Sequence, residues 1–402
     1  MRRILDRALE GDPLSPEDGY ALIGAQGADL ATVVQAAAAL NLRARPHRRV
    51  TYSRKIFLPL TNLCRDRCGY CVFVKGPIQQ GAHTMTPGEV LKVAREGARL
   101  GCKEALFSLG DHPEWRHPEF ADTLQALGGY GSTPEYVAAM CKLVLEETGL
   151  VPHTNCGTLS VEELEMLAPW NASMGIMLES SSTRLFERGG PHHGATSKAP
   201  QLRVQTIENA AKLGILMTTG ILIGIGETPE ERVDALLLIR DVAERCGNIQ
   251  EVIIQNFRAK PDTTMRHAGE PDTLDMVRSQ AVARLLLGPD MNIQSPPNLN
   301  ADHYQEYLMA GINDWGGVSP LTQDFINPEA AWPEVGRLRR TTADAGYELR
   351  ERLALYPEYV RRSIRLKPDP TGEQGHVSPA IRQRLDALAD ADGFVKPELE
   401  RM

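Results

Sequence analysis

Short apolar runs alternate with longer amphipathic stretches along most of the chain. Each run ends in polar or glycine-rich residues, and a segment with helical periodicity, such as "PGEVLKVAREGARLG", comes between one run and the next. Strands that alternate with helices of this length predict βαβ units and a parallel sheet. The predicted strands are KIFLPLT (55–61), EALFSLG (104–110), LVPHTNCG (150–157), ASMGIMLES (172–180), ILMTTGILIGIGE (215–227), EVIIQNF (251–257), MNIQSP (291–296) and GINDWGG (311–317).

Eight predicted strands favour a closed TIM-type (β/α)8 barrel of the α/β class over an open doubly wound sheet. We expect the barrel over residues 51–320, after an N-terminal helical extension (1–50) in which "SPEDGYALI" carries a helix start. Residues 321–402 lose the barrel pattern and are predicted to form a C-terminal helical extension. Its helices are expected in "WPEVGRLRRTTADAGYELRERLALY" and "SPAIRQRLDALADA".

Composition narrows the class of protein. The 402 residues carry a net charge of −8, which argues against nucleic acid or an anionic membrane as the main partner. The first residues, "MRRILDRALEGDPLSPEDGYALI", show no signal peptide, and "ADLATVVQAAAALNL" is too short and too polar to span a bilayer. Seven cysteines, three clustered and four scattered, do not resemble a secreted disulfide framework. We therefore expect a cytoplasmic protein.

The loop after the first predicted strand, "NLCRDRCGYCVF", holds the three clustered cysteines, Cys64, Cys68 and Cys71. Thiolates select zinc or iron–sulfur clusters. A closed zinc site needs a fourth ligand, and the nearest extra residues, His83 and Cys102, are isolated. Three thiolates on a cubic 4Fe–4S cluster instead leave one iron open to a small molecule. The loop therefore favours such a cluster.

The spacing Cys-x-x-x-Cys-x-aromatic-Cys, with Tyr70 as the aromatic residue, resembles the radical S-adenosylmethionine (SAM) enzymes. The resemblance implies a barrel of the radical SAM kind, with SAM bound to the open iron through its amine and carboxylate. It also implies that an electron from the cluster cleaves SAM to a 5′-deoxyadenosyl radical. An iron–sulfur electron carrier is the non-enzyme alternative, but it predicts a fourth ligand and no barrel with polar strand ends.

The same resemblance implies roles for residues at other strand ends. "FSLGDHPE" stands where the family has a Gly-Gly-Glu-type segment that binds the SAM amine, and a simple glycine turn is the alternative for it. Glu179 in "IMLESSS" falls where relatives bind the SAM ribose, and Arg203 where they bind its carboxylate, unless it is a solvated helix arginine. "TTGILIGIGET" resembles the segment that borders adenine. The residues implied are Ser108, Gly110, Asp111, Glu179, Arg203 and Gly224, together with Tyr70.

Several blocks resemble the CofG subunit family of 7,8-didemethyl-8-hydroxy-5-deazariboflavin synthase, notably "SRKIFLPLTNLCRDRCGYCVF", "IIQNFRAKP" and "GINDWGGVSPLTQDFINPEAAWPE". The resemblance implies a lyase that oxidises and cyclises an adduct made by a partner, CofH, from tyrosine and 5-amino-6-(D-ribitylamino)uracil. CofH itself and a related menaquinone-pathway enzyme are the alternatives. CofH-like sequences tend to have Phe where this chain has Tyr70.

The sequence pattern is less specific about which residues bind the substrate and the reductant. Asn256, Arg258, Asn313 and Asp314 are expected at strand ends, where they could bind a uracil or a ribityl chain; a turn before Gly316 is the alternative for the last two. His192 and His193 are either acid–base groups on a loop or solvated. The basic segment 42–55 is either solvated or a docking surface for a ferredoxin or flavodoxin reductant.

Overall fold

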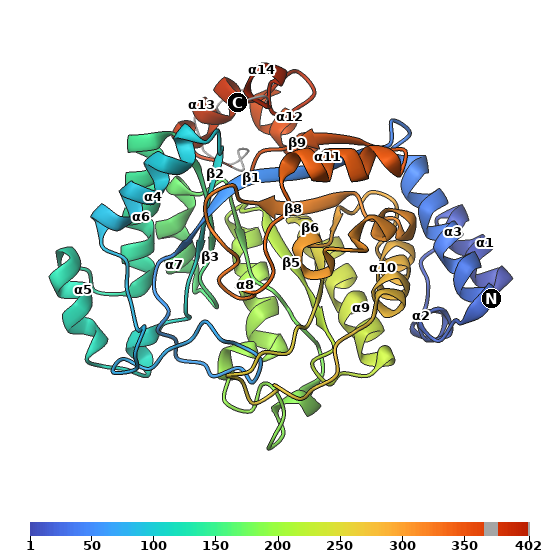
Figure 1. Ribbon diagram of the computed structural model, residues 1–402, viewed down its shortest axis with the longest axis horizontal. Helices are drawn as coiled ribbons and strands as arrows, with labels where there is room; N and C mark the ends of the chain where they lie inside the picture. Colours follow the sequence, from blue (N-terminus) through green and yellow to red (C-terminus); the bar gives the residue numbers. More distant parts are fainter. Residues whose placement is uncertain (366–376, 401–402) are drawn as a thin grey trace.

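Eight parallel strands close into a barrel at the centre of the computed structural model, which describes residues 1–365 and 377–400 (Figure 1). The barrel closes because β1 pairs with both β2 and β8. Each of the eight predicted runs overlaps one strand, so the TIM-type α/β prediction is confirmed. The strands are β1 (Arg49–Pro59), β2 (Glu104–Ser108), β3 (Val151–Asn155), β4 (Ser173–Gly175), β5 (Met217–Ile223), β6 (Ile249–Asn256), β7 (Ile293–Gln294) and β8 (Asp314–Val318).

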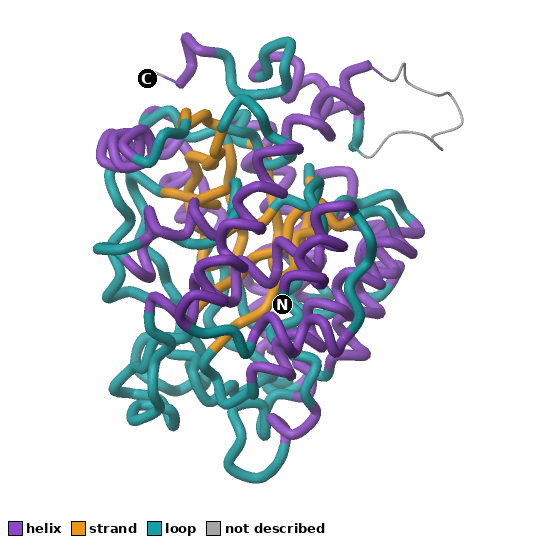
Figure 2. The backbone as a smooth tube through the Cα atoms, turned by 90° about the vertical axis from the view of Figure 1, so that its right-hand side faces the viewer, coloured by secondary structure: helices purple, strands orange, loops and turns teal. Residues whose placement is uncertain are grey.

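Helices surround the strands and bury them (Figure 2). Three of these helices begin with a capping box, at Thr86, Ser160 and Thr228. In each, the hydroxyl accepts the backbone N–H of the residue three positions later, and the carboxylate of that residue accepts the backbone N–H of the capping residue. The helices are α4 (Pro87–Arg99), α5 (Phe120–Gly128), α6 (Thr133–Thr148), α7 (Val161–Leu167), α8 (Pro200–Lys212), α9 (Pro229–Cys246) and α10 (Thr273–Leu287). Short 3₁₀ turns are η1 (Pro113–Trp115), η2 (Ala168–Trp170), η3 (Thr183–Phe186), η4 (Thr196–Lys198), η5 (Pro297–Asn300) and η6 (Tyr304–Ala310).

Three N-terminal helices, α1 (Arg2–Glu10), α2 (Pro16–Ile23) and α3 (Gly27–Ala44), lie on one flank of the barrel (Figure 1). Helix α2 begins at the predicted Ser15, whose capping box includes Asp18. Helix α3 packs against α10, and α2 packs against α9. These helices therefore extend the outer helical layer.

The C-terminal region differs from the prediction in one element. The helix expected across 332–356 ends early, as α11 (Val335–Asp344), and residues after it form a ninth strand, β9 (Glu348–Glu351). Gly346 between them has a φ of 82°, which favours glycine and stops the helix. Strand β9 pairs with the first residues of β1, at Arg49–Tyr52. The helices α12 (Pro357–Arg365), α13 (Pro379–Leu388) and α14 (Pro397–Glu400) follow.

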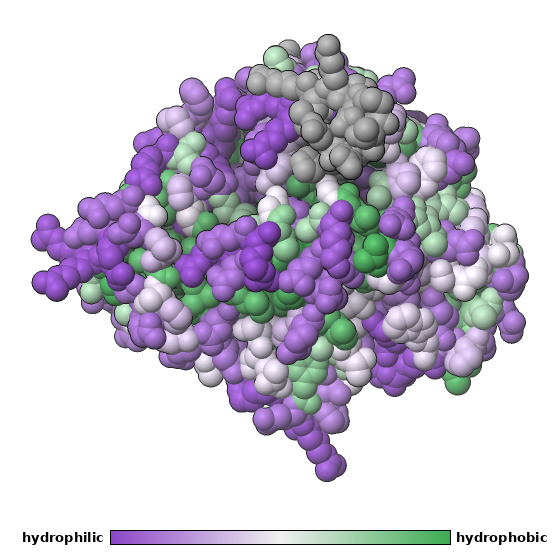
Figure 3. Space-filling model, turned by 180° about the vertical axis from the view of Figure 1, so that it is seen from behind, coloured by the Kyte–Doolittle hydropathy of each residue, from purple (hydrophilic) through white to green (hydrophobic). Residues whose placement is uncertain are grey.

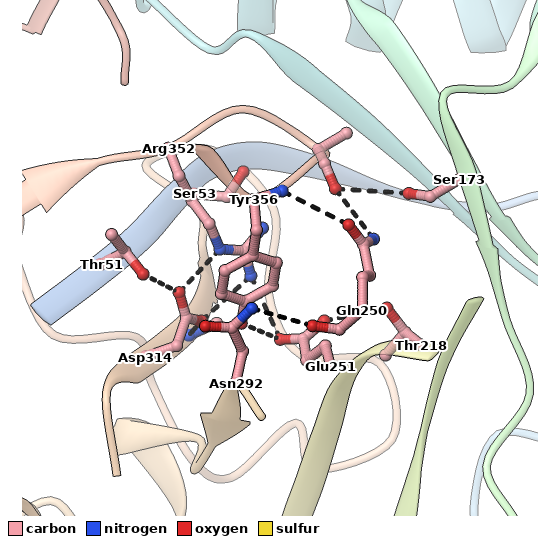
Figure 4. Close-up of polar contacts among 12 residues, drawn as sticks. Thr51, Ser53, Ser173, Thr218, Gln250, Glu251, Asn292, Asp314, Arg352 and Tyr356 are labelled. Atoms are coloured by element: carbon pink, nitrogen blue, oxygen red, sulfur yellow. Dashed lines mark hydrogen bonds and ion pairs between the residues drawn. The ribbon is translucent and has the colours of Figure 1, made fainter. Parts of the chain in front are cut away.

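The chain after β9 closes the amino-terminal end of the barrel (Figure 4). Arg352 donates to both carboxylate oxygens of Asp314, at 2.7 and 3.0 Å, and to Glu251 at 3.2 Å. The Tyr356 hydroxyl also donates to Glu251, at 2.9 Å. We call these four side chains the barrel floor. Because the strands point away from it, the floor lies opposite the loops that follow the strands.

The outer surface is mostly hydrophilic on the face shown in Figure 3, as expected for helices that turn their apolar sides towards the strands. Among the described residues, no helix combines the length and the apolar character that a membrane crossing needs.

Candidate active site at the carboxyl ends of the strands

A cavity of about 380 Å³ lies inside the barrel, between the loops at the strands' carboxyl ends and the barrel floor. Side chains from most strands face it, including the floor residues Glu251 and Arg352. The predicted site residues that line it are Cys64, Cys68, Tyr70, Cys71, Ser108, Gly110, Asp111, Glu179, Arg203, Asn256 and Arg258. Residues almost 200 positions apart in sequence therefore share one cavity.

The three-cysteine loop is held by the loops that follow other strands. Arg65 N–H donates to the Asp111 carbonyl at 2.9 Å, Arg67 N–H to that of Gly194 at 2.8 Å, and Gly69 N–H to that of Pro191 at 2.7 Å. These bonds join the loop after β1 to the loops after β2 and β4. The cysteines are thereby fixed at one end of the cavity.

The donor set suits an iron–sulfur cluster. Burial raises the pKa of the Cys64 and Cys68 thiols to about 12, so a bound cation is needed to make them thiolates. The Cys64 sulfur accepts the backbone N–H groups of Asp66 and Asp111, at 3.3 and 3.2 Å, which stabilises negative charge on sulfur.

Within residues 1–365 and 377–400, no three His, Cys, Asp or Glu side chains converge on a point as the ligands of a single metal ion do. A 4Fe–4S cluster does not require its protein ligands to converge on one point, because each thiolate binds a different iron. All seven cysteines are free thiols, and the remaining four, Cys102, Cys141, Cys156 and Cys246, are not among the described residues that line the cavity. The three loop cysteines are the ones placed to hold a cluster.

Gly110 lets the loop after β2 pass close to the cysteine loop. A Cβ at this position would lie 1.8 Å from the Leu63 carbonyl oxygen and 2.7 Å from the Cys64 Cβ. The Gly110 N–H donates to the Thr61 carbonyl at 3.0 Å. Glycine is required here for close approach of two backbones, which the sequence pattern alone did not indicate.

Asp111 is held by several partners beneath the cysteine loop. Its carboxylate contacts Arg65 at 2.9 Å and His112 Nδ1 at 2.6 Å, and it accepts the Thr158 N–H at 3.0 Å. His112 Nε2 contacts Glu163 at 2.9 Å. This network supports the loop that carries Cys64, and the SAM-binding role of Asp111 stays a prediction.

We expect the stability of this network to fall at alkaline pH. Burial lowers the pKa of His112, but hydrogen bonds to Asp111 and Glu163 outweigh it and raise the pKa to about 9. Since the folded pKa exceeds the unfolded value of about 6.5, the stabilisation is complete below pH 6.5 and is lost as the pH rises through 9. Its size is on the order of 3 kcal/mol, since each unit of difference between the folded and unfolded pKa corresponds to about 1.4 kcal/mol.

Urea unfolding of the wild type and His112→Phe between pH 6 and pH 10 measures this effect. The wild type should lose stability over that interval, whereas His112→Phe should start lower and vary less. Parallel curves for the two proteins would show that His112 is not the titrating group.

Glu179 is directed into the cavity by an uncommon backbone conformation. Its φ is 64°, and its N–H and carbonyl pair with Gly220 and Leu222 of β5 at 3.0 and 2.9 Å. Lys198 lies 2.5 Å from the carboxylate. Burial raises the pKa of Glu179, but the charges of Lys198 and Arg203 outweigh it and the pKa is lowered. The cavity thus holds an ionised carboxylate, and a left-handed non-glycine residue is often functional.

Arg203 is partly committed to the backbone. Its guanidinium donates to the carbonyls of Met177, at 2.7 Å, and Ser197, at 3.0 Å. It is buried in the cavity wall, so the alternative of a solvated helix arginine is wrong. Lys198, which the sequence analysis missed, is the other cation here. It lies in the turn η4, far along the loop after β4 and outside any motif, and only the folded chain places it beside Glu179.

Gly224 is not among the described residues of the cavity wall. Its φ is 92°, its N–H donates to Glu227 at 2.7 Å, and a Cβ would lie 2.5 Å from Pro271. Its conformation suits the turn after β5, and its place beside adenine stays a prediction. Of the two histidines, His192 is buried and contacts the Tyr70 hydroxyl at 3.2 Å, whereas His193 is exposed. The prediction of a solvated pair is wrong for His192.

Asn313 and Asp314 lie at the wrong end of the barrel for the role predicted for them. Strand β8 begins at Asp314, so Asn313 precedes the strand and Asp314 is its first residue, and neither lies at its carboxyl end. Asp314 belongs to the barrel floor, and Asn313 accepts from Arg284 at 2.9 Å. The predicted run 311–317 has too few apolar residues to show where the strand begins. The substrate-binding role predicted for Asn313 and Asp314 is therefore withdrawn.

The basic segment 42–55 also lies away from the cysteine loop, because β1 carries the chain from one end of the barrel to the other. Arg45 donates to the carbonyl of Pro289 at 2.6 Å, Arg49 pairs with Glu348 at 3.1 Å, and Arg54 pairs with Glu351 at 3.5 Å. These cations stabilise the fold, and the segment gives no support to a docking surface beside the cluster loop.

A second group of polar and charged residues in the cavity was missed by the sequence analysis. The Lys55 ammonium lies 2.6 Å from Glu104 across β1 and β2, and His153 of β3 donates to or accepts from Asn155 at 3.0 Å. All four residues line the cavity. Charged residues within apolar strands were a usable signal, because buried charges are rare unless they are paired.

The fold and the cysteine loop together define a protein of the radical SAM superfamily, whose model matches residues 58–239. Two solved structures share the fold at low identity. Methylornithine synthase (PylB) superposes with a TM-score of 0.68 at 18% identity, over 86% of this chain and 97% of that one. The hydrogenase maturase HydG from Carboxydothermus hydrogenoformans gives 0.71 at 16% identity, over 100% and 92%.

Two curated relatives are much more similar in sequence. The 7,8-didemethyl-8-hydroxy-5-deazariboflavin synthase of Methanopyrus kandleri is 46% identical over 347 residues, 86% of this chain and 100% of its own length. The FO synthase of Streptomyces coelicolor is 46% identical over 402 residues, 98% of this chain but 45% of its own length. The chain belongs to the 7,8-didemethyl-8-hydroxy-5-deazariboflavin synthase family. It spans about half the length of the FO synthases that it matches.

Proposed function

We propose that this chain performs the CofG-type half of deazaflavin synthesis. Its substrate is the adduct of a tyrosine fragment and 5-amino-6-(D-ribitylamino)uracil, and its product is 7,8-didemethyl-8-hydroxy-5-deazariboflavin, formed by oxidation and ring closure with loss of ammonia. One observation carries the proposal: the chain matches the Methanopyrus kandleri synthase along that protein's whole length, but only about half of an FO synthase. A CofH-type activity supplies the adduct.

The cavity suits this chemistry. Cys64, Cys68 and Cys71 hold the 4Fe–4S cluster, and the cluster with SAM supplies a 5′-deoxyadenosyl radical when both are bound. Glu179 accepts hydrogen bonds from the SAM ribose, and Lys198 keeps that carboxylate ionised. The barrel floor closes the far end of the cavity, which limits the entry of water to a radical reaction. A ferredoxin or flavodoxin provides the electron.

Product analysis tests the proposal. Given SAM, a reductant, tyrosine and 5-amino-6-(D-ribitylamino)uracil, the reconstituted chain alone should form no deazaflavin. Addition of a CofH-type protein, or of its small-molecule product alone, should give the fluorescent chromophore. If the chain alone consumes tyrosine and couples it to the diaminouracil, it is the CofH-type enzyme and the proposal is wrong.

Replacement of Glu179 tests the SAM site separately. Glu179→Ala should weaken SAM binding by roughly ten- to hundredfold, because a hydrogen bond to a charged group contributes about 1.5–3 kcal/mol. Iron content should not change, since Glu179 is not a cluster ligand. SAM affinity is measured by equilibrium binding to the reconstituted protein, with Glu187→Ala, an exposed glutamate of the same loop, as the control. Equal SAM affinity in Glu179→Ala and the control would exclude this role.

A further inference from the structure

The segment 319–332, between β8 and α11, forms part of the cavity wall outside the barrel strands. Asp324, Phe325, Asn327 and Trp332 line the cavity together with Phe57 of β1. The segment has no helix or strand of its own. Its side chains therefore reach the cavity from a loop, which is where binding residues on a rigid scaffold are often found.

The loop is fixed by hydrogen bonds to three different strand ends. The Thr322 hydroxyl accepts the Phe57 N–H at 2.8 Å, and Asn298 donates to Asp324 at 3.0 Å. Lys260 donates to Asn327 at 2.8 Å. Trp332 stacks on Phe57, with ring centroids 5.1 Å apart and planes 4° apart. The loop is thus preorganised before any ligand binds.

Three buried polar atoms in this wall have no hydrogen-bond partner among the residues that the structure describes: Trp332 Nε1, Asn256 Oδ1 and Arg258 Nε. Arg258 Nε lies 3.3 Å from Glu270 in an ion pair, which leaves Trp332 Nε1 and Asn256 Oδ1 as the two uncompensated atoms. Asn256 is only 5% exposed, and its other polar atom, Nδ2, donates to the Leu299 carbonyl at 3.4 Å. An unpaired buried polar group is costly, so a cavity wall that keeps two of them is suited to a ligand that pairs with them.

The two atoms specify complementary chemistry. Trp332 Nε1 can only donate a hydrogen bond, and Asn256 Oδ1 can only accept one. The nearby cation Lys260 already donates to Arg258 and Asn327. A ligand here therefore needs a carbonyl acceptor and an N–H donor on a flat, uncharged ring that can lie against aromatic side chains.

The geometry points to a subsite for a dioxopyrimidine ring, built from Trp332, Phe57 and Asn256. Trp332 donates to a ring carbonyl that lies in the plane of its indole, and Asn256 accepts from a ring N–H. Phe57, stacked on the indole, fixes the direction of the Trp332 N–H. The subsite rests on the proposed function, because it assigns the uracil part of that substrate to one wall of the cavity. The tyrosine-derived phenol then occupies another part of the cavity.

Binding measurements on the reconstituted, SAM-loaded chain test the assignment. The probe is 5-amino-6-(D-ribitylamino)uracil, titrated anaerobically by calorimetry, and p-cresol is the phenol probe. Trp332→Phe keeps an aromatic ring but removes the N–H, and Asn256→Ala removes the acceptor. Each should weaken uracil binding by roughly three- to tenfold, the usual effect of one neutral hydrogen bond. Trp170→Phe, outside the cavity, is the matched control and should bind like the wild type.

The outcomes separate this inference from the proposed function. The subsite is wrong if both variants bind the uracil probe as tightly as the wild type does, or if the wild type does not bind it. It is also wrong if the variants lose affinity only for p-cresol. If the wild type forms the chromophore and both variants keep its KM for the adduct, the subsite is also wrong while the function stands. If the wild type forms no chromophore from the adduct, the function fails whatever the binding of the uracil probe shows.

Discussion

Each of the single substitutions Cys64→Ser, Cys68→Ser and Cys71→Ser should abolish the formation of 5′-deoxyadenosine from SAM. All three sulfurs face the cavity, and a cubic cluster with three protein ligands has none to spare. Anaerobic reconstitution of the wild type should give about four irons per chain. Iron and sulfide analysis, together with the cluster's visible absorption, measures the loss in each variant.

The other four cysteines provide the matched controls. Cys102, Cys141 and Cys156 are buried in the core, and Cys246 is partly buried at the end of α9. Their serine variants should keep the wild-type iron content, although a buried serine can lower stability slightly. Loss of the cluster in any of these four would identify a further ligand and contradict the open iron that SAM requires.

Arg352→Met should cause the largest loss of stability expected from a single substitution away from the cysteine loop. Arg352 is 3% exposed and is the cation that pairs with Asp314 and Glu251. Methionine fills a similar volume but leaves two buried carboxylates without that cation. Removal of one partner from a buried ion pair typically costs about 3–5 kcal/mol.

Urea unfolding of the cluster-free chain measures this cost, with Arg95→Met as the control. Arg95 pairs with Glu147 at 2.8 Å, but its side chain is 61% exposed, so its loss should cost at most about 1 kcal/mol. If the two variants unfold at the same urea concentration, the barrel floor does not stabilise the fold and its closure of the cavity is incidental.

The sequence predicted most of the fold because barrel strands are local signals. Most of the eight strands contain or adjoin a short run of apolar residues, and burial by helices outside and side chains inside favours that composition. The cysteine loop could also be predicted from the sequence, because the three proposed cluster ligands come from one segment with a fixed spacing. The capping box at Ser15 was local for the same reason. Hydrogen bonds between residues three positions apart need no tertiary context.

The sequence failed where a role depends on which end of a strand a residue occupies. The sequence around Asn313 and Asp314 allows a strand that ends before these residues or one that begins at them. The first would place them at the active face, and the second, which the structure shows, places them at the floor end of the barrel. Residues 348–351 of the C-terminal extension are similar. They were predicted as helix, but the open edge of β1 turns them into β9, and that edge exists only in the folded barrel.

The chain's local patterns alone determined a (β/α) barrel with one three-cysteine loop at its active face. Tertiary structure decided which other side chains meet that loop: Lys198 beside Glu179, Gly110 beneath Leu63, and Trp332 above Phe57. Those partners are far apart along the chain or carry no motif, so their contacts arise only from the closure of the barrel. The physical reason is that a strand's composition reports its burial, whereas its neighbours are set by the pairing and register of all eight strands together.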